Sequence, residues 1–199
     1  MTVSDSKKLF HEKFPYVIPG LYKRIVDEML VELNLLNHQN EFAKDYLFCF
    51  GLTETFKELM KGYKPEKHLD PLFESLCISA NFEAKEIKDI SLKTQKDFND
   101  KSSKDILELL IEKSNTKLYP SRILNLGIYI LIANSKEFKE GNQPEMNKMI
   151  SDVFEKLNLS INKAEKDIGI YKSTIKKMDQ AKELIEELRI KGKGTEQKQ

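Results

Sequence analysis

The chain has 199 residues, which is enough for one sizeable hydrophobic core or for a core with an extension. Charged residues make up 33% of it, and 33 Lys and Arg nearly balance 32 Asp and Glu, so no overall field attracts nucleic acid. The only arginines, the residues that best bind phosphate in a bidentate manner, are Arg24, Arg122 and Arg189. The composition favours a soluble protein with a mixed-charge surface over a nucleic-acid-binding protein.

Cysteine content and hydropathy indicate the redox compartment and whether the chain crosses a membrane. Cys49 and Cys77 are too few for a disulfide framework, and each lies in an apolar helical pattern, so we expect buried thiols in a reducing compartment. No secretory signal leads the sequence, and the most apolar run, Ile123 to Ala133, is too short to span a bilayer. We therefore expect no transmembrane segment and no signal or transit peptide, although the protein could lie against a membrane.

Helical periodicity dominates the chain, and no alternating strand pattern extends beyond a few residues. Each predicted helix has an apolar stripe at three- and four-residue spacing. In chain order the predicted helices are Ser4 to Phe14, Gly20 to Leu36, Tyr46 to Met60, a fourth from Asp70, Glu83 to Phe98, Ser103 to Lys113 and Pro120 to Asn134. Short loops between them predict an all-α fold, a compact multi-helix bundle over residues 1–139.

Residue types at the helix ends set these expected boundaries. Ser4 is expected to cap the first helix, and Asp70 with Pro71 to start the fourth. Gly62 should end the third. The helix from Pro120 is apolar almost all round, so it should be the central one of the bundle.

The C-terminal part has a different character. After a turn marked by Gly141 and Pro144, the sequence predicts a long C-terminal helix or coiled-coil arm over residues 144–191, with room for a kink at Leu157 to Asn162. The last residues, 192–199, are polar and glycine-rich and are expected to be disordered.

Apolar residues of this arm follow the spacing of a coiled-coil a/d seam. The seam consists of Ile161, Ala164, Ile168, Tyr171, Ile175 and Met178. Two alternatives remain open: the helix packs back on its own domain, or it projects and these six residues bind a partner. The other faces of the arm mix both signs of charge, which favours protein over lipid as the contact.

Two glutamates, Glu28 and Glu32, lie one turn apart at the edge of an apolar stripe. A carboxylate-bridged metal site in a helical bundle would also need Glu-x-x-His pairs, and none of the three histidines completes one, so no metal site is expected. We expect Arg24 to pair with Glu28 at i, i+4, and Arg122 to supply a second cation from another helix.

No other motif points to catalysis. There is no Walker loop, no Gly-x-Gly-x-x-Gly, no zinc-ligand spacing, and neither cysteine has a histidine nearby in sequence. Gly51 in the run FCFGLTETF is best explained by a close contact between helices. The sequence predicts a protein with no catalytic residues and no cofactor.

Five segments, in chain order and covering nearly the whole chain, are similar to those of one family. They are TVSDSKKLF (Thr2 to Phe10), YKRIVDEMLVELNLL (Tyr22 to Leu36), FGLTETFKELMKGYKP (Phe50 to Pro65), YPSRILNLGIY (Tyr119 to Tyr129) and DIGIYKSTIKKMDQA (Asp167 to Ala181). The chain thus resembles the thylakoid formation proteins, also known as photosystem II biogenesis factor Psb-twenty-nine, in their cyanobacterial form. It departs from them at Asn34, where histidine is common, at the inserted Pro120, and at Asn125, which replaces a small apolar residue.

The resemblance implies a non-enzymatic accessory protein of oxygenic phototrophs, tied to thylakoid membrane organisation and to photosystem II assembly and repair. It implies binding to membrane FtsH-type protease complexes and a peripheral position on the cytoplasmic side of the thylakoid membrane. We expect the arm or its neighbouring bundle face to dock on the protease. The alternative is a structural homodimer, associated with the membrane surface, that organises thylakoid membranes.

Overall fold

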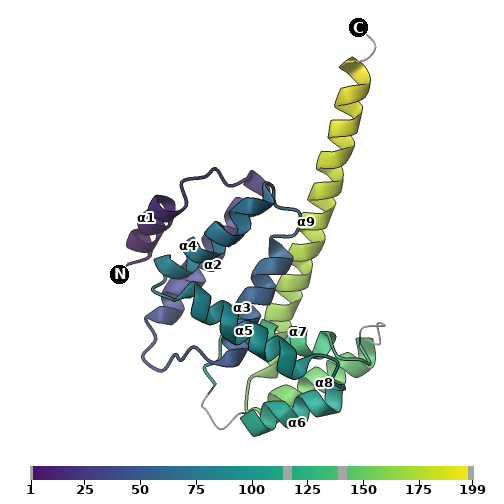
Figure 1. The fold of residues 1–199 in the computed structure, drawn as a ribbon. Helices are drawn as coiled ribbons and strands as arrows, with labels where there is room; N and C mark the ends of the chain where they lie inside the picture. Colours follow the sequence, from purple (N-terminus) through teal and green to yellow (C-terminus); the bar gives the residue numbers. More distant parts are fainter. Residues whose placement is uncertain (1, 114–117, 139–142, 197–199) are drawn as a thin grey trace.

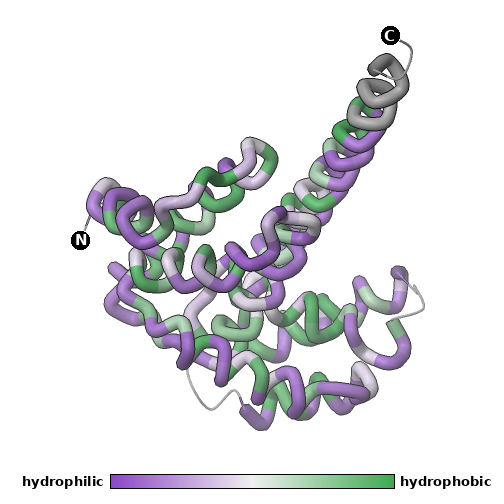
Figure 2. Tube along the Cα trace, turned by 45° about the horizontal axis from the view of Figure 1, so that its top comes forward, coloured by the Kyte–Doolittle hydropathy of each residue, from purple (hydrophilic) through white to green (hydrophobic). Residues whose placement is uncertain are grey.

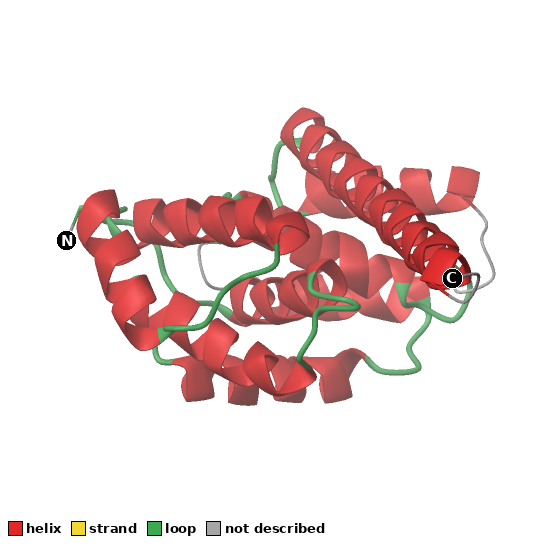
Figure 3. Cartoon of the chain, turned by 90° about the horizontal axis from the view of Figure 1, so that it is seen from above, coloured by secondary structure: helices red, strands yellow, loops and turns green. Residues whose placement is uncertain are grey.

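The computed structural model describes residues 2–113, 118–138 and 143–196, and all regular structure in these ranges is helical, as predicted. The helices are α1 (Val3–Lys13), α2 (Gly20–Asn37), α3 (Tyr46–Leu59), the 3-10 turn η1 (Glu66–His68), α4 (Leu69–Ser79), α5 (Ala84–Phe98), α6 (Ser103–Lys113), α7 (Arg122–Ala133), α8 (Gln143–Lys156) and α9 (Ile161–Glu196). Figure 1 shows α1 to α8 forming a body along which α9 runs before extending past it. Seen from above, the described chain consists only of helices and loops (Figure 3).

The crossing of α3 and α7 forms the centre of the body, and most residues of both helices are buried. The two helices touch backbone to backbone. A Cβ atom added at Gly51 would lie 2.3 Å from the carbonyl oxygen of Ile123, and one at Gly127 would lie 2.6 Å from that of Leu47. Only glycine fits at either position, which confirms the close contact predicted for Gly51 and the central place predicted for the apolar helix.

Three helix starts differ from the sequence expectation by one to a few residues. Thr2, instead of Ser4, caps α1, because its hydroxyl accepts a hydrogen bond from the N–H of Asp5 in a capping box. Asp70 lies inside the first turn of α4, since the turn η1 already leads into that helix, and its carboxylate lies 3.0 Å from Lys88 Nζ. Ser121 caps α7, where its Oγ accepts from the N–H of Leu124, so the helix begins after Pro120.

The arm predicted as one helix over residues 144–191 is two helices. Asn158 adopts a left-handed conformation with φ 54°, which ends α8, and the Ser160 hydroxyl accepts a hydrogen bond from the N–H of Lys163 at the start of α9. The expected kink is therefore a full break, and α8 belongs to the body. Helix α9 continues to Glu196, so the disorder expected from residue 192 is not found up to there, while residues 197–199 lie outside the described ranges.

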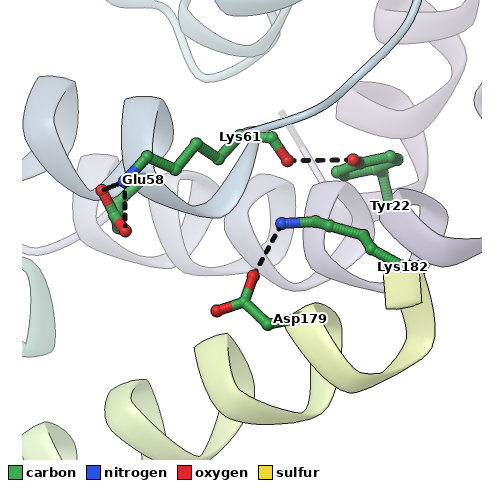
Figure 4. A network of polar contacts seen from close by, with 5 residues as sticks. All are labelled: Tyr22, Glu58, Lys61, Asp179 and Lys182. Carbon is green, nitrogen blue, oxygen red and sulfur yellow. Dashed lines mark hydrogen bonds and ion pairs between the residues drawn. The ribbon is translucent and has the colours of Figure 1, made fainter. Parts of the chain in front are cut away.

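A polar network marks the place where α9 leaves the body (Figure 4). Tyr22 donates its hydroxyl proton to the carbonyl oxygen of Lys61 over 3.0 Å, next to the turn at Gly62, which has φ 81°. Lys182 donates to Asp179 over 3.0 Å, and its alkyl chain lies against Gly62, where an added Cβ would be 3.6 Å from Cε. The base of the projecting part is thus fixed against α2 and the turn after α3.

Candidate functional site

Both ion pairs expected between the four candidate residues are present. Arg24 Nε lies 2.8 Å from Glu28 Oε1 along α2, on a strongly exposed edge. Arg122, the first residue of α7, lies 3.8 Å from Glu32 Oε2. The structure therefore brings all four residues together, with the more buried pair crossing from α2 to α7.

Opposing electrostatic effects act on the carboxyl group of Glu32. Burial is the main cause that raises the pKa of its carboxyl above the usual 4.5, and nearby Asp167 and Glu28 raise it further. The Arg122 guanidinium and a hydrogen bond from the N–H of Ile123 act in the opposite direction. These groups come from α2, α7 and α9, so the three helices meet at Glu32.

Asn125 extends the cluster to α9. This residue is buried, and its Nδ2 donates a hydrogen bond to Asp167 Oδ2 over 2.8 Å. The amide thus satisfies a carboxylate that lies close enough to Glu32 to influence its titration. Asn125 therefore has a structural role, because its side chain links α7 to α9.

An open groove of about 800 Å³ lies between α2 and the segment that leads into α7. The α2 wall includes Val31, Glu32 and Leu35, and the other wall includes Tyr119 and Arg122. Leu35 is 52% exposed, so a large apolar side chain faces solvent inside a groove with charged edges. We refer to this surface as the α2–α7 groove.

The six seam residues of α9 lie against the chain's own body. Ala164, Ile168, Tyr171 and Met178 are buried, and Ile161 and Ile175 are partly buried against the same core. Tyr171 packs edge-on against Tyr129 of α7, with 6.3 Å between ring centroids. Of the two alternatives for the seam, the structure shows packing on its own domain, with four of the six side chains buried and Ile161 and Ile175 partly exposed. Binding of a partner by these six residues stays a prediction.

Sequence reasoning missed two exposed apolar features. One is Leu35, which lies outside the apolar stripe of α2 and is exposed in the groove beside Val31. The other is formed by Leu184, Ile185 and Leu188 on the part of α9 beyond the body. The sequence itself indicates the second feature, because Leu184 and Leu188 are apolar although they fall outside the a/d seam.

Both cysteines have the environment expected from the sequence. Cys49 and Cys77 are free and buried, and burial raises the pKa of each thiol to about 12. A thiol in that state is a poor nucleophile at neutral pH. Among the described residues, no group of three or more His, Cys, Asp or Glu side chains is placed to hold a metal ion.

None of the described helices combines the length and the apolar character that a bilayer crossing requires.

Fold and groove together define a class: a protein whose described residues are helical, with an open groove of mixed charge between α2 and the segment that leads into α7. Comparison with known proteins identifies the family. The family model described as thylakoid formation protein matches residues 2–199, so the chain belongs to that family. The family is named for thylakoid formation, which is an accessory role and not an enzymatic activity.

Individual relatives agree with this assignment. Protein Thf1 of Prochlorococcus marinus (strain MIT 9312) is 82% identical over 193 residues, which cover 97% of this chain and 96% of the relative. Protein Thf1 of Prochlorococcus marinus subsp. pastoris (strain CCMP1986 / NIES-2087 / MED4) is 70% identical over 198 residues, covering 100% and 98%. A solved structure of Psb29 at 1.55 Å superposes with a TM-score of 0.86 at 26% identity, covering 100% of both chains. The resemblance to the cyanobacterial form of the family is confirmed.

Proposed function

We propose that this chain is a non-enzymatic accessory factor in thylakoid membrane biogenesis and in photosystem II assembly and repair, and that it docks its α2–α7 groove on a membrane FtsH-type protease complex and stabilises that complex. One observation carries the proposal. The two segments Tyr22 to Leu36 and Tyr119 to Tyr129, which carry the family resemblance, fold together and form the walls of this groove.

The groove has the make-up of a protein contact site. Its centre contains the exposed Leu35 next to Val31, and its edges carry ion pairs that are already formed. Protein interfaces commonly combine an apolar centre with a polar rim in this way, and the apolar centre supplies most of the binding energy. Glu32, held by Arg122 and by a backbone N–H, forms part of the α2 wall.

The charge of the groove favours a protein over a lipid surface. Lys7, Lys23, Arg24 and Arg122 are nearly balanced by Asp27, Glu28 and Glu32 among the lining residues. A surface that binds anionic lipid headgroups would show a clear excess of cations. A membrane-bound protein partner also accounts for a peripheral position on the cytoplasmic side of the thylakoid membrane. The FtsH-type protease is the partner that the family resemblance implies.

Affinity purification from cyanobacterial membranes tests this proposal. Tagged wild-type protein is expected to recover FtsH-type subunits. Leu35→Glu places an unpaired carboxylate in the centre of the groove and is expected to abolish that recovery. Because Leu35 is half exposed, the substitution should leave the fold intact, which far-UV circular dichroism can check.

Leu92→Glu is the matched control. Leu92 is 50% exposed, nearly as much as Leu35, but lies on α5 outside the groove. Recovery of the protease with this variant should equal that of the wild type. If Leu35→Glu retained the protease, or if both variants lost it equally, the groove would not be the docking surface.

A further inference from the structure

The first turns of α9 meet the body through apolar side chains and one carboxylate. Ala164, Ile168 and Tyr171 are buried in the core. Figure 2 shows hydrophilic and hydrophobic segments alternating along α9, as expected for a helix that turns one side toward the body. Asp167 lies between these buried residues in the sequence, and its Oδ2 accepts a hydrogen bond from Asn125 of α7. A charged group is therefore present where α9 begins to pack on the body.

The carboxyl group of Glu32 faces this contact from α2, and its side chain is only 22% exposed. Arg122 of α7 is its cationic partner, with 3.8 Å between Nε and Oε2, which is too long for a hydrogen bond between these two atoms. The N–H of Ile123 donates a hydrogen bond to the same carboxyl group. From α1, Lys7 lines the groove that Glu32 also lines. The ionised form of Glu32 is thus favoured mainly from α7.

Two carboxylates oppose the ionised form of Glu32. Glu28 lies one turn earlier on α2 and is already paired with Arg24. Asp167 acts from α9, and its charge raises the pKa of the Glu32 carboxyl more than the charge of Glu28 does. Glu32 therefore faces charges from all three helices. The repulsion between Glu32 and Asp167 is the one that depends on α9 being packed in place.

Asn125 holds the carboxylate of Asp167 at this position. Asn125 is buried, and its Nδ2 lies 2.8 Å from Asp167 Oδ2. The side chain of Asp167 is itself only partly buried, so this hydrogen bond keeps its charge directed toward the body. Asn125 is a positioning residue for that charge. We call Glu32, Arg122, Asn125 and Asp167 together the α9 clasp.

Thermodynamic linkage gives the sign of the effect. Burial is the main cause that raises the pKa of Glu32, and the charge of Asp167 adds to it. Because the packing of α9 brings Asp167 to Glu32, it strengthens proton binding by Glu32, and a bound proton stabilises the packing of α9 in return. This contribution is present below the ordinary pKa of 4.5 and is lost as pH rises through the raised pKa.

We propose that the α9 clasp is a proton-sensitive attachment of the first turns of α9 to α2 and α7. When Glu32 is protonated, it no longer repels Asp167, and the first turns of α9 pack firmly. When Glu32 is ionised, the two carboxylates repel each other across the contact, and this part of α9 opens more often. The proposal concerns the attachment of α9 and does not depend on the protease or on an occupant of the α2–α7 groove.

Carbon-13 NMR of the side-chain carboxyl groups tests the first step on purified full-length protein. The Glu32 signal, assigned by its loss in Glu32→Gln, should titrate above the usual 4.5. Asp167→Asn removes the charge but keeps an oxygen that can accept from Asn125, so it should lower the pKa of Glu32. Glu165→Gln is the matched control. This exposed residue lies about 200° away from Asp167 around α9, and its substitution should leave that pKa unchanged.

Hydrogen exchange followed by mass spectrometry tests the second step. Exchange of peptides from residues 161–171 is measured between about pH 5 and pH 8 and corrected for the intrinsic effect of pH on amide exchange. In the wild type, protection should fall about 3-fold or more over this range. Glu32→Gln should abolish the fall and Asp167→Asn should reduce it, whereas Glu165→Gln should retain it.

Either of two results would overturn the proposal. One is a Glu32 carboxyl group that titrates at the same pH in Asp167→Asn as in the wild type. The other is a pH dependence of exchange at residues 161–171 that Glu32→Gln leaves unchanged. Far-UV circular dichroism checks that each variant is folded. Should Glu32→Gln fail to fold, an unchanged pH dependence of exchange in Asp167→Asn would overturn the proposal equally.

Discussion

Gly51→Ala probes the packing that fixes the whole body. In most helices this substitution stabilises the protein by about 1 kcal/mol, since alanine favours the helical conformation over glycine. Here the added Cβ would lie 2.3 Å from the carbonyl oxygen of Ile123 and 3.0 Å from Cα of Gly127. Both neighbours are backbone atoms and have no rotamer in which to move away.

The magnitude follows from the geometry. An ordinary contact begins near 3.4 Å, so α3 and α7 would have to separate by about 1 Å along the line of contact. Overpacking of this kind costs about 1 to 3 kcal/mol, and the high end applies where backbone meets backbone along the central helix pair. Loosened side chains beside the crossing add to the cost because dispersion contacts weaken steeply with distance. We expect a net loss of about 2 kcal/mol after the gain in helix propensity.

Gly169→Ala provides the matched control. Gly169 lies inside α9, no atom is within 4 Å of an added Cβ, and its φ is not positive. This variant should gain about 0.5 to 1 kcal/mol from helix propensity alone. Urea unfolding followed by far-UV circular dichroism gives both free energies of unfolding. If Gly51→Ala were as stable as Gly169→Ala, the close approach of α3 and α7 would be refuted.

Three further predictions concern other parts of the body. Because the pKa of Glu32 is raised in the folded state, its protonation favours folding, so the free energy of unfolding falls as pH rises from about 4.5 through the raised pKa. Glu32→Gln should remove that part of the pH dependence in urea titrations. An unchanged pH dependence would contradict the buried position. Phe154→Ala should cost about 3 to 5 kcal/mol in the free energy of unfolding, since this side chain is fully buried, and a loss under about 1 kcal/mol would show that α8 is loosely packed. Cys49 and Cys77, with pKa values near 12, should react with a thiol reagent at pH 8 only after urea is added, whereas rapid reaction of the folded protein would show that they are accessible.

Local pattern was enough to predict the helices and the nature of the core. The apolar stripes predicted helices close to the bounds observed, because burial of one face is the same requirement in sequence and in structure. Gly51 could be assigned to a helix contact without knowing its partner. The pairing of Glu32 with Arg122 could be proposed because two glutamates one turn apart need a second cation.

The structure differs from the sequence prediction where one residue or one tertiary contact determines the local conformation. The break between α8 and α9 depends on the left-handed conformation of Asn158 and on the cap at Ser160, which periodicity cannot reveal. The seam on α9 had the spacing for a partner helix, but the same spacing serves packing on α7. The groove at Leu35 was missed because Leu35 lies outside the apolar stripe of α2, and the sequence of α2 does not show that the segment before α7 forms an opposite wall.

Site-specific photocrosslinking in living cyanobacteria shows directly what contacts the α2–α7 groove. A photoreactive amino acid at position 35 replaces the leucine that faces solvent in the α2–α7 groove, and one at position 92 samples α5. We expect position 35 to become covalently linked to an FtsH-type subunit and position 92 not to. Crosslinks to that protease from position 92 alone, or crosslinks from position 35 only to other proteins, would contradict this expectation.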